Sequence, residues 1–92
     1  MHIKVKFLAY FRDLFQSREK IIALPEGARL RQLLGSLCDS AERHKAVFGK
    51  EESLSPHIVI MKNGVPVQNS GGLDAALENG DVIAIFPFIG GG

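Results

Sequence analysis

The sequence predicts an α+β domain in which one main helix packs on one face of a mixed sheet of about five strands. The chain has 92 residues, of which 46% are hydrophobic and 23% are charged, a balance typical of one small globular domain. Its first residues alternate between apolar and polar, as in a half-buried strand. Residues 28–48 instead follow the three-and-four spacing of an amphipathic helix.

Five segments have the pattern of β-strands. They span residues 2–8, 19–24, 58–61, 65–67 and 82–86. The first places Ile3, Val5 and Phe7 on one face, and the second stops at Pro25. The third and fourth flank Asn63-Gly64, a dipeptide typical of tight hairpins. A short helical turn is expected over residues 9–16, between the first two strands.

The main helix is predicted to begin near Ala28. Its apolar stripe consists of Leu30, Leu33, Leu34, Leu37, Cys38, Ala41 and Phe48. Gly35 lowers its stability by about 1 kcal/mol relative to alanine. Asp39-Ser40 can either break the helix or cap a second piece, which leaves its end open by several residues.

The order of these elements is strand, strand, helix, strand, strand, strand. In so short a chain the economical packing lays the helix stripe across one face of the sheet. We therefore expect a β-grasp, or ubiquitin-like, roll over residues 1–88, followed by a flexible glycine tail, residues 89–92. The N-terminal and C-terminal strands are expected side by side in the middle of the sheet.

Charge and composition argue against several function classes. Eleven Lys and Arg oppose ten Asp and Glu along the chain, so no basic stripe is predicted to bind nucleic acid. No apolar run approaches the roughly 20 residues of a membrane span, and no signal peptide is visible. The single Cys38 fits a reducing compartment, so a cytoplasmic location is expected. His2, His44 and His57 lack metal-ligand spacing, and no metal site is predicted.

The chemistry is predicted to lie in the last residues, Phe86 to Gly92. A run ending in Gly90, Gly91 and Gly92 cannot build a core, but it is slender enough to enter a narrow active site. Residues 89–92 can extend by roughly 14 Å. A free carboxylate is a poor electrophile, and the chain has no phosphate-binding glycine loop, so a partner must use ATP to activate it. The alternative is a frayed terminus without function.

Several motifs together resemble the ubiquitin-like sulfur carriers of the MoaD/ThiS type, above all the small subunit of molybdopterin synthase. The motifs are Ile3 to Ala9 with Arg12-Asp13-Leu14, Asn63-Gly64, Gly71-Gly72-Leu73-Asp74, Asn79-Gly80-Asp81, and Phe86-Pro87 through Gly91-Gly92. The resemblance covers nearly the whole chain. The turn that leads through an apolar strand to Phe-Pro and a terminal glycine pair is its most specific part.

The resemblance implies a non-catalytic sulfur carrier that binds no cofactor of its own. An E1-like enzyme would use ATP to adenylate the Gly92 carboxylate, and a persulfide sulfur would replace AMP. The thiocarboxylate would then deliver sulfur, in molybdopterin biosynthesis to a larger synthase subunit. Gly90 and Gly91 would belong to the same tail.

A docking surface is expected beside the tail. If Ile83 and Ile85 face the helix, alternation places Phe86 on the open face of the sheet, where Leu8 joins it. Such an apolar patch suits a protein partner. The predicted partner-binding residues are Leu8, Phe86, Pro87, Phe88 and Ile89. The alternative is that Phe86 packs against the short helix around Phe11.

Other functions remain open at this point. The chain can instead supply sulfur for cysteine or thiamine synthesis, although the residues around 44–56 make it longer than typical thiazole carriers. It can also be a ubiquitin-like modifier whose Gly92 forms isopeptide bonds with lysines, or a plain binding module.

The remaining polar residues are predicted to be structural. Cys38 lies on the helix stripe and is interpreted as an inert core thiol. Glu51-Glu52, Asp74 and Glu78 are interpreted as solvated or turn-forming, and Lys62 as solvated.

Overall fold

The computed structural model describes residues 1–89, which contain a five-stranded sheet with the strand order β2-β1-β5-β3-β4. The strands are β1 (His2–Phe7), β2 (Glu19–Ala23), β3 (Ile58–Lys62), β4 (Val65–Pro66) and β5 (Val82–Pro87). The predicted β-grasp architecture is confirmed.

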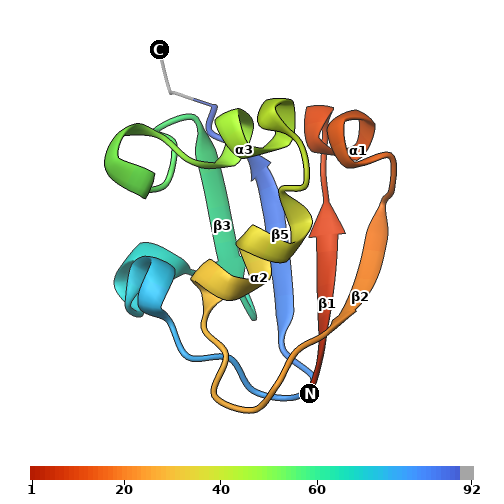
Figure 1. Ribbon diagram of the computed structural model, residues 1–92, viewed down its shortest axis with the longest axis vertical. Coiled ribbons are helices and arrows are strands. Elements are labelled where there is room, and N and C mark those ends of the chain that lie inside the picture. Colours follow the sequence, from red (N-terminus) through yellow and green to blue (C-terminus); the bar gives the residue numbers. More distant parts are fainter. Residues whose placement is uncertain (90–92) are drawn as a thin grey trace.

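The first and last strands form the centre of the sheet. β1 pairs with β5 in parallel, with Val5 opposite Ile83 and Phe7 opposite Ile85. The pairs β1–β2, β3–β4 and β3–β5 are antiparallel. Figure 1 shows β1 and β5 side by side with both carboxyl ends at the same end of the sheet. The prediction that the N-terminal and C-terminal strands lie side by side in the middle of the sheet is therefore confirmed.

Three helices accompany the sheet. They are α1 (Tyr10–Phe15), α2 (Leu30–Leu37) and α3 (Ala41–Val47). In Figure 1, α2 lies in front of the central strands, and α1 and α3 lie at the end of the sheet where β1 and β5 finish. Three short 3₁₀ turns, at Lys50–Glu52, Val67–Asn69 and Gly72–Asp74, complete the described elements.

The core lies between the sheet and α2. Alternating residues of β1 and β5 meet the leucine stripe of α2, and all of them are at least 95% buried. These residues are Ile3, Val5, Phe7, Leu30, Leu33, Leu34, Leu37, Ile83 and Ile85. Phe15 of α1 stacks on Phe7 with the ring centroids 4.6 Å apart, which fixes α1 over the end of β1.

The expected single main helix is two helices. α2 ends at Cys38, and the Ser40 hydroxyl accepts a hydrogen bond from the Arg43 backbone N–H at 3.1 Å, which starts α3. The sequence left open whether Asp39-Ser40 breaks the helix or caps a second one. The structure shows that Ser40 caps a second helix, α3. As a result Ala41, which was predicted on the buried stripe, is exposed.

Two further segments differ from the expectation. The strand predicted over residues 65–67 ends at Pro66, because Val67 begins a 3₁₀ turn that buries its side chain completely. The Lys62 side chain, predicted to be solvated, is partly exposed, and its Nζ also donates to the Ala76 carbonyl at 2.9 Å. Lys62 lies on the helix side of β3, opposite the buried Ile83, so its ammonium reaches this loop.

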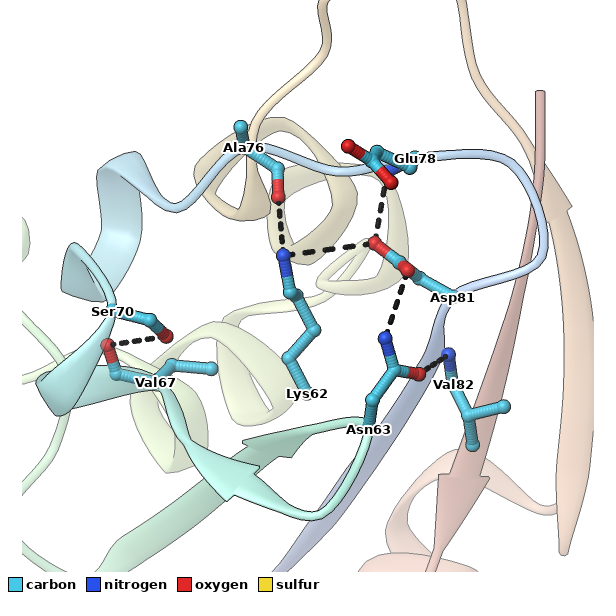
Figure 2. Close-up of polar contacts among 8 residues, drawn as sticks. All are labelled: Lys62, Asn63, Val67, Ser70, Ala76, Glu78, Asp81 and Val82. Atoms are coloured by element: carbon cyan, nitrogen blue, oxygen red, sulfur yellow. Dashed lines mark hydrogen bonds and ion pairs between the residues drawn. The ribbon is translucent and has the colours of Figure 1, made fainter.

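A polar clamp joins the turn before β5 to the hairpin between β3 and β4 (Figure 2). Asp81 is only 7% exposed and accepts hydrogen bonds from the Asn63 side chain at 2.9 Å and the Glu78 backbone N–H at 2.8 Å. The Asn63 side-chain oxygen accepts from the Val82 N–H at 2.9 Å, and Lys62 Nζ lies 3.9 Å from Asp81. The clamp therefore anchors the start of β5.

Cys38 terminates α2 as a half-buried residue packed beside the core. Burial raises the pKa of its thiol to about 11, the Asp39 carboxylate adds to this increase, and Arg43 partly opposes it. The thiol therefore stays protonated at neutral pH and is a weak nucleophile.

We predict that Asp81→Ala lowers the free energy of unfolding by about 2 kcal/mol, because it removes a buried acceptor and leaves two partly buried hydrogen-bond donors without a partner. Urea unfolding followed by circular dichroism measures this loss. Asp74→Ala is the matched control: Asp74 forms an exposed ion pair with Arg31 at 3.1 Å, and its loss should cost at most about 1 kcal/mol. Equal losses in the two variants would contradict the clamp.

We also predict that iodoacetamide alkylates Cys38 in the folded protein about 100-fold more slowly at pH 8 than in the unfolded chain. Since the pKa of the folded thiol is raised to about 11, the thiolate fraction and hence the rate should rise about tenfold per pH unit at pH values below this pKa. Mass spectrometry of the alkylated fraction against time measures the rate. Equal rates in folded and urea-unfolded protein would show that the fold neither raises the pKa of the thiol nor shields it, and would contradict this prediction.

Candidate functional site

The end of β5 directs the chain away from the sheet. Pro87 lies opposite Ile58 of β3, and the next backbone N–H, that of Phe88, donates to the His57 carbonyl at 2.9 Å. Ile89 is then 86% exposed. The predicted carrier residue Gly92 and the tail residues Gly90 and Gly91 lie outside the described residues.

A shallow groove of about 360 Å³ lies beside this point on the sheet. It is lined by Leu8, Ala9, Arg12, Phe86, Pro87 and Ile89. The parallel pairing of β1 and β5 creates it, because the Leu8 N–H donates to the Ile85 carbonyl at 3.0 Å and so sets Leu8 next to Phe86. We call these six residues the tail-root groove.

The structure brings together four of the five residues predicted to bind a partner. Leu8, Phe86, Pro87 and Ile89 line the tail-root groove, whereas Phe88 does not line it and is 59% exposed. Phe86 is partly exposed and lies outside the hydrophobic core cluster, while Phe11 of α1 is 1% exposed within it. The geometry thus places Phe86 on the groove rather than in the core, and its role in partner binding stays a prediction.

Two groove residues, Ala9 and Arg12, were not predicted. Ala9 has φ 52° and ψ −132°, and the turn it forms brings the Phe11 N–H to the Leu8 carbonyl at 3.1 Å. Arg12 Nε donates to the Phe7 carbonyl at 3.1 Å, which holds the arginine at the groove. The signal available in the sequence was the spacing, since Arg12 follows Leu8 by about one helical turn.

A second hollow of about 330 Å³ lies between α1, α3 and the segment before β3. Its lining residues are Tyr10, Phe11, Glu42, Lys45, Ala46, Ser55 and His57. His57 also holds Phe88 through its carbonyl, so the hollow and the tail-root groove flank the same stretch of chain. Tyr10 is 51% exposed here. Apolar surface therefore surrounds the point where the chain leaves the sheet.

The four acidic residues that the sequence analysis interpreted as solvated or turn-forming are all exposed. Glu52 contacts His44 at 3.1 Å and Asp74 contacts Arg31 at 3.1 Å, while Glu51 and Glu78 are exposed. Within residues 1–89, no group of three or more His, Cys, Asp or Glu side chains is arranged to hold a metal ion. None of the helices in this part of the chain is long and apolar enough to cross a membrane.

Comparison with known proteins gives matches over the whole chain. Over 92 residues, 100% of both chains, the sequence is 26% identical to small archaeal modifier protein 3 of Haloferax volcanii. A structure of a candidate molybdopterin converting factor, subunit 1, from Pyrococcus furiosus is 36% identical, with a TM-score of 0.78 over 97% of this chain and 99% of that one. A chain of the BexX/CysO complex of Amycolatopsis orientalis is 26% identical, with a TM-score of 0.73 over 98% and 99%.

The model of the ThiS family matches residues 5–92, which include the second half of β1, all of β5, the tail-root groove and the three C-terminal glycines. The match thus covers the features that set this chain apart from a plain β-grasp domain. The chain therefore belongs to the ThiS family, among the small ubiquitin-like sulfur carriers and modifiers.

Proposed function

We propose that this chain carries sulfur on its C-terminal glycine. The observation that supports this function best is the course of the chain after β5: the strand at the centre of the sheet leads through Phe88 to Ile89, which is 86% exposed. Three glycines follow directly in the sequence. The folded body thus holds the root of a segment whose composition suits entry into another protein's active site.

The proposed chemistry begins with an E1-like enzyme. The Gly92 carboxylate attacks the α-phosphate of ATP, pyrophosphate leaves, and an acyl-adenylate forms. The terminal sulfur of a persulfide then attacks the acyl carbon and AMP leaves. A thiol reductant cleaves the remaining S–S bond, which yields the thiocarboxylate and a disulfide.

Glycine suits this sequence of steps. A side chain on residue 92 would crowd both the mixed anhydride and the incoming sulfur. The described residues contribute no nucleophile to the reaction, because the Cys38 thiol is half-buried and protonated at neutral pH. In this proposal the chain binds no cofactor, and the partner enzymes supply the catalytic groups and bind ATP.

We assign the sulfur to molybdopterin biosynthesis, with a larger synthase subunit as the acceptor. The 36% identity to the Pyrococcus furiosus protein over nearly all of both chains supports this assignment. A large synthase subunit that copurifies with the chain from its host would test it directly, whereas a copurifying sulfhydrylase would indicate cysteine synthesis.

A second function, protein modification, is favoured by the full-length match to small archaeal modifier protein 3. The same acyl-adenylate would then react with the ε-amino group of a target lysine, and AMP would leave as the isopeptide bond forms. This function predicts ladders of higher mass on a denaturing gel, each band containing the C-terminal peptide joined to a lysine.

We predict that deletion of Gly92 leaves the thermal midpoint within about 2 °C of wild type and abolishes thiocarboxylation. The deletion lies beyond the last described backbone hydrogen bond, that of Phe88, so the fold should not depend on it. The measurement is mass spectrometry of the C-terminal peptide, with thiol alkylation to separate sulfur gain from oxidation of Met1 or Met61.

The control for this experiment is the full-length chain incubated with the activating enzyme and persulfide donor but without ATP. It should remain a carboxylate. Thiocarboxylation of the deleted chain, or of the full-length chain without ATP, would contradict the proposed route.

We predict that Phe86→Ser weakens binding to the E1-like enzyme at least tenfold, as expected for an aromatic anchor at an interface. Phe86 is partly exposed and lies outside the core cluster, so the thermal midpoint of the Phe86→Ser variant should lie less than about 5 °C below that of wild type. Isothermal titration calorimetry measures the affinity. Ile21→Ser is the matched control, since Ile21 is 56% exposed at the other end of the same sheet face. A large loss of stability in Phe86→Ser would instead favour a role in the core.

A further inference from the structure

The outer edge of β2 is a free edge of the sheet. β2 is the outermost strand beside β1, as Figure 1 shows. Arg18 and Leu24, which flank the strand, bond to the β1 side through backbone hydrogen bonds of 2.9 Å each. Because the direction of the backbone groups alternates along a strand, the even-numbered residues bond to β1. Glu19, Ile21 and Ala23 therefore direct their N–H and C=O groups away from it.

Both ends of this edge are closed. The Ser17 hydroxyl donates to the Glu19 carbonyl at 2.8 Å and accepts from the Glu19 N–H at 3.3 Å. Pro25, at the other end, has no N–H to donate. Within residues 1–89, no loop or side-chain group bonds to the outward backbone of Ile21 or Ala23, and both residues are exposed. The free backbone groups of the edge are thus those of Ile21 and Ala23.

The side chains along the free part of the edge are apolar. Ile21 is 56% exposed, and the neighbouring Ile22 and Leu24 are partly buried against the core. The charged residues 18–20 come before this apolar tract. The opposite edge of the sheet is less open, since β4 has only two residues and one of them is proline. An apolar edge with free backbone groups is a place where another strand adds to a sheet.

We infer that this edge pairs with the β2 edge of a second copy of the chain, antiparallel and about a two-fold axis at Ile22. In this register Ile21 of each chain lies opposite Ala23 of the other, and Ile22 lies opposite its own counterpart. Each Ile21–Ala23 pair exchanges both backbone hydrogen bonds, as directly opposed residues of an antiparallel ladder do. The free groups of both chains are then satisfied, and the contact is the same from either side, as a closed dimer requires.

The backbone groups select this register over its neighbours. An axis at Ile21 would set Ala23 opposite Glu19, whose backbone groups are already held by the serine hydroxyl. An axis at Ala23 would set Ile21 opposite Pro25, which has no N–H. The axis at Ile22 is the one that matches each free residue with another free residue.

The side chains favour the same register. An axis at Lys20 would set the lysines of the two chains directly opposite each other, and like charges in that position are unfavourable. The axis at Ile22 instead sets Lys20 opposite Leu24, so the two lysines lie on opposite sides of the axis. The isoleucines meet at its centre. Because the strand complements its own reversed copy in both backbone and side chains, a second copy is the occupant that this edge fits.

The dimer leaves the tails free. When two β2 strands pair antiparallel, the carboxyl ends of the two β1 strands lie at opposite ends of the joined sheet. Each tail-root groove lies between β1 and β5, away from the paired edge. The inference therefore does not depend on the proposed function. Since so short an edge buries little surface, the dimer is weak and depends on concentration.

The test is sedimentation equilibrium of the full-length chain from about 10 µM to about 1 mM. The apparent mass of wild type should rise from that of one chain toward that of two. Ile21→Lys should raise the dissociation constant at least tenfold, because a lysine on an edge opposes strand addition. Val65→Lys is the matched control: Val65 is 49% exposed on β4 at the other edge, so its dissociation constant should stay within twofold of wild type.

A second variant tests the backbone contact. Ala23→Pro removes an N–H that points away from β1, so it should prevent dimer formation while the thermal midpoint stays within about 5 °C of wild type. Amide hydrogen exchange in wild type tests the register. The Ile21 and Ala23 amides should exchange at least fivefold more slowly at about 1 mM than at about 10 µM, and the Glu19 amide should not.

Several outcomes would overturn the inference. A wild-type chain that stays a monomer at 1 mM would do so, and would leave the edge of β2 to a strand of another protein. Equal dissociation constants for Ile21→Lys and Val65→Lys, or a folded Ala23→Pro variant that dimerises like wild type, would exclude this edge as the interface. Slower exchange at Glu19 in place of Ala23 would exclude the axis at Ile22. None of these results bears on whether the C-terminal glycine carries sulfur.

Discussion

The parallel pairing of β1 with β5 is the constraint on which the rest of the structure depends. It joins the two ends of the chain in the middle of the sheet and buries Val5, Phe7, Ile83 and Ile85 against α2. Because the strands are parallel, their carboxyl ends lie together. The turn after β1 and the tail after β5 therefore start from the same end of the sheet, and the tail-root groove is formed between them.

The two ends of β5 are held by different interactions. At its start, the buried carboxylate of Asp81 accepts from the Asn63 side chain and the Glu78 N–H, and the exposed Asn63 accepts from the Val82 N–H, so this end is tied into the fold. At its finish, the single hydrogen bond from Phe88 to the His57 carbonyl is followed by exposed Ile89. A strand that is fixed at one end and leaves the sheet at the other can present its tail while the body stays rigid.

Under the proposed function, chemistry and recognition would belong to different parts of the chain. The chain belongs to the ThiS family and is similar both to a modifier protein and to a sulfur-carrier subunit, and a terminal glycine activated as an acyl-adenylate would serve either function. The proposal therefore assigns the choice of partner to the folded surface. In this chain the surface beside the tail is an apolar groove whose lining includes Arg12 and Ala9, and Ala9 has a positive φ.

The sequence by itself determined the fold class, the central position of the terminal strands and the glycine tail. These follow from local signals: alternation in residues 2–8, the leucine stripe of α2 and the turn residues at Asn63-Gly64 and Asn79-Gly80. Periodicity could not locate the break at Ser40, because the apolar spacing continues across it and only the capping hydrogen bond decides the start of α3. The sequence also could not place Lys62, whose ammonium binds the carbonyl of Ala76 far along the chain. Only the tertiary structure decided that Ala9 and Arg12 join Leu8 and Phe86 in one groove, because the register between two strands nearly 80 residues apart creates that contact.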